Sequence, residues 1–258
     1  ERLDWSDFHL LADGLDALFA PPRTPLLLRL LRAMFVVDLI GQSKFEKISC
    51  ERLKDFLGLI SLAANDEVPP SACVPHEPTS AGKMQFRMLV AQYARKDTHA
   101  AMSQGWHNRW TLFRSALAFA KGTGKIPPLQ SIFREVPFRD LEGEFGPLSE
   151  DVDEILTRYF RVKIQGLHFC GPAYYGVPFV EGFQSLALMY PVVMWLARWL
   201  AVSDARRSVT TDDVSQALAI ADHHHGYSPI FGSASFRRRV RLLASTGDLR
   251  HLCTWYGR

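Results

Sequence analysis

The sequence predicts an all-α protein: a multi-helix bundle with a long apolar central helix and irregular loops rich in glycine and proline. Three observations predict this class. Apolar residues recur every three or four positions along most of the 258 residues, which is the period of an amphipathic helix. No stretch alternates apolar and polar residues as a substantial sheet requires. The run from Phe183 to Val202 is strongly apolar, as is typical of a helix at the centre of a bundle.

The helices are expected to follow one another with clear breaks. Pro21-Pro22 ends the first helix and Gly41 ends the second. Ser149 precedes an acidic first turn, and Thr210 with Asp213 has the pattern of a capping box. In chain order, helices are predicted over residues 5–18, 26–40, 45–64, 82–102, 106–121, from Ser149 to the loop that begins at Gly166, and over 183–202, 214–221, 236–243 and 248–256.

The stretch from Glu67 to Gly82 is the clearest loop, because it contains four prolines together with Ser, Thr and Gly. We expect a single helical domain over residues 1–258. The alternative is a subdivision near residues 65–82, which would separate N-terminal helices in 1–64 from a main body in 83–258. A chain of this length can bury a sizeable core without disulfides or a structural metal.

Charge and cysteine content narrow the class of protein. The net charge of +3 is too mild to predict nucleic-acid binding. The four cysteines lie far apart with no CxxC pair, so we expect reduced thiols and a cytoplasmic location. Between Glu181 and Arg198 only 16 residues are uncharged, whereas a membrane-spanning helix needs about 20 mostly apolar residues. We therefore predict a buried core helix and no membrane span.

A run of three histidines near residue 224 is the first candidate for chemistry, because imidazole is the commonest transition-metal ligand. Neighbouring helical positions diverge by about 100°, so at most two of the three rings can share a site and a further ligand must come from elsewhere. The candidate metal ligands are His223, His224, His225, His168 and Cys170, with His251 as a further donor. In the alternative interpretation the histidines end a helix, where they favour its dipole and Gly226 takes the left-handed cap.

A loop of unusual composition, from Gly166 to Gly182, is the second candidate. Its glycines allow close approach of a ligand, and its phenols offer stacking faces and hydrogen bonds. The candidate cofactor-binding residues are Gly171, Tyr174, Tyr175 and Gly176. Cys170 beside His168 has the residue types of a thiolate–imidazolium nucleophile. In the alternative interpretation, glycine and proline set the turn while the aromatic rings pack against the following helix.

Four arginines within five positions form the third candidate. They are Arg237, Arg238, Arg239 and Arg241, and they are predicted to bind a phosphate, a nucleic-acid backbone or an acidic protein partner. The alternative is the solvated face of a short helix that buries Phe236, Val240 and Leu243 on its opposite side. Because the overall charge does not extend the patch, the solvated-face interpretation is favoured and nucleic acid is not expected as a partner; a protein partner or protein substrate stays open as an alternative.

Several phrases, taken in order, resemble the helical region that follows the metal-chelating segment of the cysteine-cluster proteins. This family of zinc- or iron-chelating proteins includes the flagellin lysine N-methylases. The phrases lie at residues 3–8, 156–163, 169–176, 222–227 and 235–237, so the resemblance runs over most of the chain. The resemblance is one of pattern and carries no catalytic signature.

The resemblance implies a helical body that supports an iron–sulfur cluster or zinc module and, in the methylase branch, helps to present S-adenosylmethionine or a protein lysine. The family's closely spaced cysteines are absent from this sequence, so the cluster is expected upstream of Glu1 or has been removed. Cys170 and Cys253 are not taken as replacements. Whether the chain is an enzyme stays open. The alternatives are a non-catalytic helical protein-interaction module and a self-contained metalloenzyme that uses the histidine run.

Overall fold

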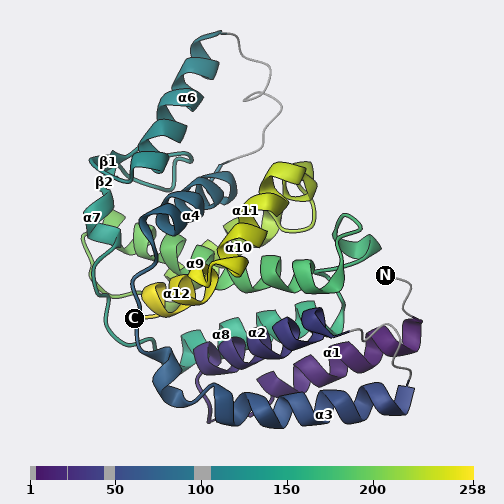
Figure 1. Ribbon diagram of the computed structural model, residues 1–258. Coiled ribbons are helices and arrows are strands. Elements are labelled where there is room, and N and C mark those ends of the chain that lie inside the picture. Colours follow the sequence, from purple (N-terminus) through teal and green to yellow (C-terminus); the bar gives the residue numbers. More distant parts are fainter. Residues whose placement is uncertain (1–3, 22, 44–49, 96–105) are drawn as a thin grey trace. The chain divides into compact units, whose positions relative to one another are not determined.

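The computed structural model describes residues 4–21, 23–43, 50–95 and 106–258, and for residues 50 and 106–112 it describes the backbone only (Figure 1). These residues form eleven α-helices and a single two-residue strand pair. The all-α prediction is therefore confirmed. The chain divides into two compact units. Unit 1 comprises residues 1–74 and 153–187, and unit 2 comprises residues 75–152 and 188–258.

The chain passes between the two units three times, and the first passage, at Val74–Pro75, falls in the proline-rich stretch near residues 65–82. The second passage lies near the start of a helix, and the third lies within the long apolar helix. Each unit is therefore built from segments that are distant in the sequence.

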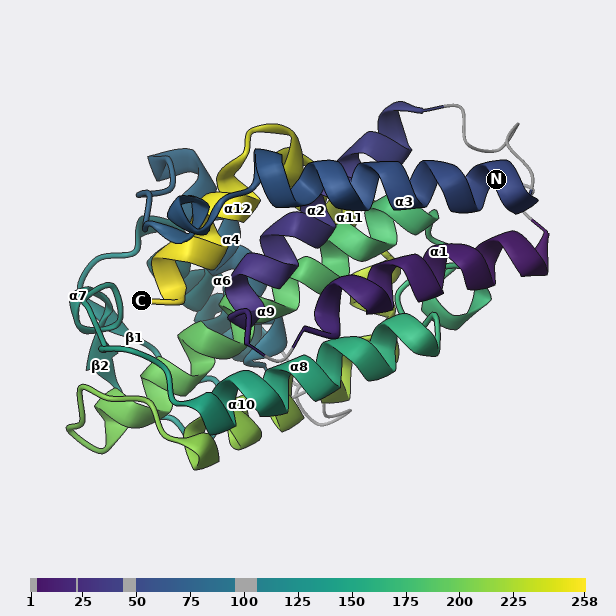
Figure 2. The same ribbon diagram turned by 90° about the horizontal axis from the view of Figure 1, so that it is seen from below.

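Unit 1 is built mainly from four amphipathic helices. Its elements are α1 (Trp5–Phe19), α2 (Leu26–Gln42), α3 (Cys50–Glu67), η2 (Pro70–Cys73), most of α8 (Glu150–Gln165), η3 (Pro172–Tyr174) and the first part of α9 (Phe179–Ser203). In both views α1 runs alongside α3 (Figures 1 and 2). The Arg161 guanidinium of α8 donates two hydrogen bonds, each over 2.8 Å, to the Asp16 carboxylate of α1. Phe19 and Phe160 stack with ring centroids 5.8 Å apart, which joins α1 to α8 in the core. The predicted starts of α1 and α2 are confirmed, and α3 extends to Glu67 rather than 64.

A buried arginine in unit 1 connects the end of α1 with the carboxylate that binds the start of α2. The Arg29 guanidinium on α2 donates to the Phe19 carbonyl at the end of α1 over 2.6 Å and to the Asp153 carboxylate on α8 over 2.7 Å. The same carboxylate accepts the Leu26 N–H at the start of α2 over 2.7 Å. One ion pair thus satisfies backbone groups that two helix termini leave without partners.

Unit 2 contains the remaining helices and the strand pair. Its elements are α4 (Ser80–Tyr93), α6 (Trp106–Lys121), β1 (Lys125–Ile126), β2 (Val136–Pro137), α7 (Phe138–Leu141), the rest of α9, α10 (Thr211–His224), η4 (Pro229–Gly232), α11 (Ala234–Ser245) and α12 (Asp248–Tyr256). Strands β1 and β2 are antiparallel, with Ile126 opposite Val136. The bounds predicted for α6 and α12 match residue for residue, and the Thr210–Asp213 capping box is present.

The helix predicted over 82–102 is shorter than expected. It begins at Ser80, because the Thr79 hydroxyl accepts the Gly82 N–H as an N-cap, and it ends at Tyr93. The Gln130 amide donates to the Ala94 carbonyl over 2.9 Å and so takes one of the acceptors at the helix end. Residues 96–102 of the predicted helix lie outside the described residues.

The long apolar helix α9 is the longest described element and begins at Phe179, earlier than the predicted residue 183. Among the described helices only α9 is long and apolar enough to cross a membrane by length and composition, and 94% of its most apolar window is buried. This burial is typical of a core helix, and it agrees with the core helix that the sequence predicts. Pro191 lies inside the helix and has no N–H, so one helical hydrogen bond is missing there.

A fully buried guanidinium ties α9 to two other helix ends in unit 2. Arg198 is 0% exposed. One nitrogen donates to the carbonyls of Leu141 and Gly143, each over 3.0 Å, and the other donates to the carbonyls of Tyr256 and Arg258. These acceptors are at the C-terminal ends of α7 and α12, where helices leave carbonyls without partners.

Replacing Arg198 with Met removes the donor for four carbonyls while keeping much of the apolar stem. We expect the free energy of unfolding to fall by about 3 kcal/mol, because buried acceptors left without donors are costly. Arg207→Met is the control: this side chain is 59% exposed and, of the residues that the structure describes, it forms hydrogen bonds with Asp140, so about 0.5 kcal/mol or less should be lost. Urea unfolding followed by circular dichroism measures both. Equal losses in the two variants would contradict the role given to Arg198.

Two helical glycines should respond in opposite directions to replacement by alanine. A Cβ at Gly82 would collide with the Asp248 carboxylate, which accepts the N–H and hydroxyl of Thr79, each over 2.8 Å. A Cβ at Gly58 in α3 meets nothing within 4 Å. We expect Gly82→Ala to lower the free energy of unfolding by about 1–3 kcal/mol and Gly58→Ala to raise it by about 0.5–1 kcal/mol. A stabilised Gly82→Ala variant in the same urea titration would show that the capping carboxylate is not tightly packed.

Candidate functional site

The predicted aromatic loop joins α8 to α9 within unit 1 and folds back on itself through backbone hydrogen bonds. The Gly171 N–H donates to the Val177 carbonyl and the Gly176 N–H to the Gly171 carbonyl, both over 2.8 Å. Gly171, Gly176 and Tyr175 all have positive φ angles, of 58°, 68° and 53°. Glycine takes this conformation readily, whereas a tyrosine in it is uncommon and is held there by its surroundings.

The two tyrosines predicted to bind a cofactor differ in exposure. Tyr174 is 1% exposed and is part of the core, whereas Tyr175 is half-buried. Their ring centroids lie 5.0 Å apart at 62°. Burial raises the pKa of the Tyr174 phenol above its usual range and raises the pKa of Tyr175 to about 12. Both phenols therefore remain protonated at neutral pH, and only Tyr175 leaves part of its ring open to solvent.

The start of the loop is pressed against the first turns of α9. A Cβ at Gly182 would collide with the Phe169 carbonyl, so only glycine allows the backbones to approach this closely. The Phe169 ring lies 5.3 Å from that of Phe179 and 5.9 Å from that of Phe183. This packing agrees with the structural interpretation of the aromatic loop and fixes the position of Tyr175 relative to α9.

The candidate nucleophile pair is not brought together. Cys170 is buried at 3% exposure, whereas His168 is exposed and its ring lies over Gly166. The reason is local: the positive φ of Leu167 turns the chain between α8 and the loop, so the two side chains lie in different environments.

The histidine run ends α10, as the structural interpretation of the sequence expects. His223 is exposed, His224 and His225 are buried, and the rings of His223 and His224 lie 5.2 Å apart. His224 also stacks on Phe231 at 6.3 Å. Gly226 has a φ of 90° and takes the left-handed conformation after the helix. Within the described ranges no three or more His, Cys, Asp or Glu side chains are grouped so as to hold a metal ion.

The arginine cluster lies on α11, whose Phe236, Val240 and Leu243 are buried as predicted. Arg238 and Arg241 are exposed and have no carboxylate within 4 Å among the residues that the structure describes. Arg239 is half-buried and donates to the Gln85 side chain on α4, and Arg237 is half-buried. Binding of a protein partner by these residues stays a prediction.

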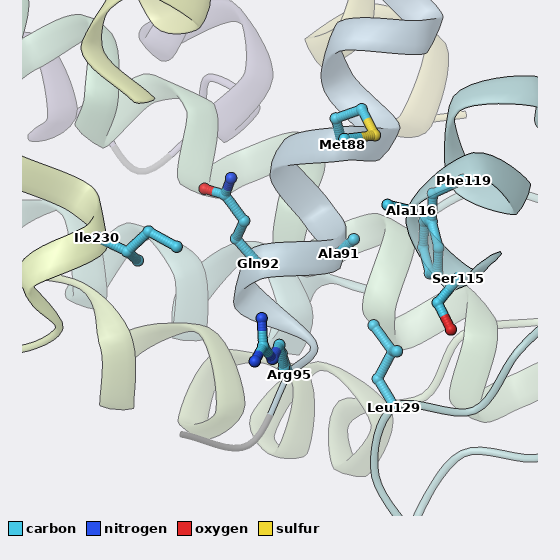
Figure 3. A pocket seen from close by; sticks show the side chains of 9 residues that line it. All are labelled: Met88, Ala91, Gln92, Arg95, Ser115, Ala116, Phe119, Leu129 and Ile230. Carbon is cyan, nitrogen blue, oxygen red and sulfur yellow. The ribbon is translucent and has the colours of Figure 1, made fainter. Parts of the chain in front are cut away.

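A pocket that the sequence did not predict lies in unit 2, between α4 and α6. Its volume is about 180 Å³. The lining residues are Met88, Ala91, Gln92 and Arg95 from α4 and its end, Ser115, Ala116 and Phe119 from α6, Leu129 from a loop and Ile230 from η4. Gln92 and Ile230 lie on one side, and the α6 residues with Leu129 lie on the other (Figure 3). The space exists because Ala91, Ser115 and Ala116 are small, so the facing helices do not fill it.

Three polar side chains, Gln92, Arg95 and Ser115, line this pocket, which is otherwise mainly apolar. The Gln92 side-chain oxygen is buried, and no described residue donates a hydrogen bond to it. The half-buried Arg95 guanidinium has no carboxylate within 4 Å among the described residues. The sequence signal for this site is faint: two polar residues next to small ones at the end of an amphipathic helix.

Comparison with known proteins does not identify a relative. No family model matches the chain, and neither the curated proteins nor the solved structures contain a significant match. The assignment of function therefore depends on the geometry and on the sequence pattern.

Thiol reactivity tests where the structure places the cysteines. In a Cys50→Ser variant we expect Cys73, which is half-buried, to react with Ellman's reagent in the folded protein, whereas Cys170 and Cys253 react only after unfolding. Burial raises the pKa of both the Cys73 and Cys253 thiols, so the reaction of Cys73 should be slow at neutral pH. Fast labelling of Cys170 in the folded protein would contradict its burial and would restore it as a candidate nucleophile.

Proposed function

We propose that the chain is the helical body of a cysteine-cluster metalloprotein that modifies protein lysine with S-adenosylmethionine. Two features support this function. The phrases that resemble the family fall on connected elements: residues 156–163 on α8 and 169–176 in the loop that follows it within unit 1. In unit 2, residues 222–227 end α10 and residues 235–237 open α11. The all-α architecture is the one that the resemblance implies.

The observation that carries the proposal is the conformation of Tyr175. A non-glycine residue with φ 53° and ψ 22° persists only where its surroundings hold it, and such residues cluster at functional sites. Gly171 and Gly176 hold the loop on both sides of it through their hydrogen bonds and positive φ angles. In the proposed function Tyr175 supplies a stacking face and a protonated hydroxyl to a substrate or cofactor, while the buried Tyr174 supports it.

The metal ligands are not assigned to this chain. The described residues offer no group of three or more His, Cys, Asp or Glu side chains for zinc or for a cluster, so the residues present do not fit such a group. The proposal places the ligands in a cysteine-rich segment outside this sequence. The role given to the helical body is to bind and orient, and no chemical step is assigned to a metal.

Metal analysis and methyl transfer in the full-length gene product test this function. We expect iron or zinc in that product and none in this chain alone, together with transfer of a labelled methyl group from S-adenosylmethionine to lysine of flagellin. Tyr175→Ala should lower the rate of methyl transfer about tenfold, because it removes the ring while alanine still has to adopt the positive φ at this position. The metal content should not change. Tyr227→Ala is the control, because that side chain is 79% exposed and lies outside the loop.

Each contrary outcome has a distinct meaning. A full-length product without iron or zinc removes the cysteine-cluster proposal. If this chain alone binds metal, the candidate ligands become the histidine run at His223, His224 and His225. A wild-type rate in Tyr175→Ala removes the role of the loop and leaves the rest of the proposal in place.

A further inference from the structure

The arginine cluster on α11 belongs to a C-terminal segment whose positive charge the overall charge of the chain conceals. Residues 222–258 contain six arginines, two aspartates, no lysine and no glutamate, so the segment has a net charge of +4. The whole chain has a net charge of +3, so residues 1–221 have a net charge of −1. The positive charge is thus local, which suits a short acidic ligand better than an extended polyanion.

One face of α11 presents two of these arginines to solvent together with a leucine. The apolar face of the helix is buried, and α11 packs on η4, α4 and α12 within unit 2. Arg238, Arg241 and Leu242 are exposed on the other side, Leu242 at 45%. Residues three and four positions apart on a helix have Cβ atoms about 5–6 Å apart, so these side chains are neighbours. We call these three residues the α11 surface.

The described residues do not neutralise the charge of the α11 surface. Neither Arg238 nor Arg241 has a carboxylate of the described residues within 4 Å. Arg239, which lies between them in the sequence, donates to the side chain of Gln85 on α4, and this partner is neutral. Each exposed guanidinium can bind a carboxylate through two parallel hydrogen bonds, so both forks are available to an acidic ligand.

The exposed leucine indicates the class of ligand. Leu242 follows Arg241 directly and lies one helical turn after Arg238. A free phosphate or a nucleic-acid backbone offers no apolar group to such a side chain, whereas a protein segment can present carboxylates and an apolar side chain together. An amphipathic helix places side chains one turn apart on one face, which is the spacing of the two arginines.

We propose that the α11 surface binds an acidic helical segment of a protein partner. Two carboxylates one turn apart in that segment pair with Arg238 and Arg241, and an adjacent apolar side chain packs on Leu242. The inference rests on unit 2 alone, whereas Tyr175, which carries the cysteine-cluster proposal, is in unit 1. Either proposal can therefore fail without the other.

A designed peptide tests the proposal with this chain. Three repeats of Glu-Leu-Ala-Glu-Glu-Leu-Ala form an acidic stripe beside a leucine stripe on one helix. With the fluorescein-labelled peptide at nanomolar concentration, we expect fluorescence anisotropy to show about tenfold tighter binding than for the same peptide with Gln in place of Glu. A peptide with Ala in place of Leu should bind about threefold more weakly. Raising sodium chloride from about 50 mM to about 500 mM should weaken binding about tenfold, because exposed charges are screened.

Two double variants with the same change in net charge test whether α11 is the binding surface. Arg238→Gln with Arg241→Gln should weaken binding about tenfold and abolish the preference for Glu over Gln in the peptide. Arg139→Gln with Arg207→Gln is the matched control, because these side chains are 87% and 59% exposed in unit 2 and lie outside α11. The control should bind within about twofold of the wild type. Leu242→Ser should weaken binding about threefold and leave its salt dependence unchanged.

Several results would overturn the proposal. These are equal affinities for the Glu and Gln peptides, binding that salt leaves unchanged, or an equal loss in the two double variants, which would show an effect of net charge alone. Tighter binding of oligouridine or of phosphatidylserine vesicles than of the acidic peptide would assign the surface to a nucleic acid or a membrane instead. A negative peptide test together with metal and methyl transfer in the full-length product would leave the proposed function standing without this surface.

Discussion

The buried guanidinium of Arg198 is the interaction on which unit 2 depends. Removing a charge from water is costly, and the cost is met here by four carbonyl acceptors and by the rings of Phe145 and Tyr256, which lie 4.7 and 5.3 Å from the guanidinium carbon. Burial lowers the pKa of Arg198 to about 10, so the group is still charged at neutral pH. Only arginine has enough donors in a flat fork to serve the ends of two helices at once. The position of α9 in unit 2 therefore determines where α7 and α12 end.

In unit 1 a buried arginine, Arg29, likewise supplies a hydrogen bond to a helix end. Arg29 and Asp153 form an ion pair that also satisfies the end of α1 and the start of α2. In unit 2 the Asp248 carboxylate does likewise at the start of α4, across 169 positions of the sequence. Several helix termini in this protein are thus satisfied by side chains from other helices, beside the local caps at Thr79 and Thr210. The candidate sites are on the segments between these fixed ends, namely the aromatic loop and the pocket at the end of α4.

The helices were predictable where the signal is local. The apolar period and nearby breaks placed α6 and α12 to the residue, and the Thr210–Asp213 box marked the start of α10. The end of α4 was not predictable, because a side chain of a later loop satisfies the Ala94 carbonyl there. The aromatic loop was found from its composition, but the burial of Tyr174 and the exposure of Tyr175 depend on the left-handed turns between them. The pocket could not be predicted, since its lining comes from four separate segments.

Pro191 in α9 has a mechanical consequence. The helix belongs to unit 1 up to Ala187 and to unit 2 from Leu188, and the proline removes one helical hydrogen bond within a turn of that boundary. A helix that lacks one bond of its ladder bends at a lower cost there than elsewhere along its axis. At this passage the two units are therefore linked by a helix that bends and twists more easily near Pro191 than an uninterrupted helix of the same length.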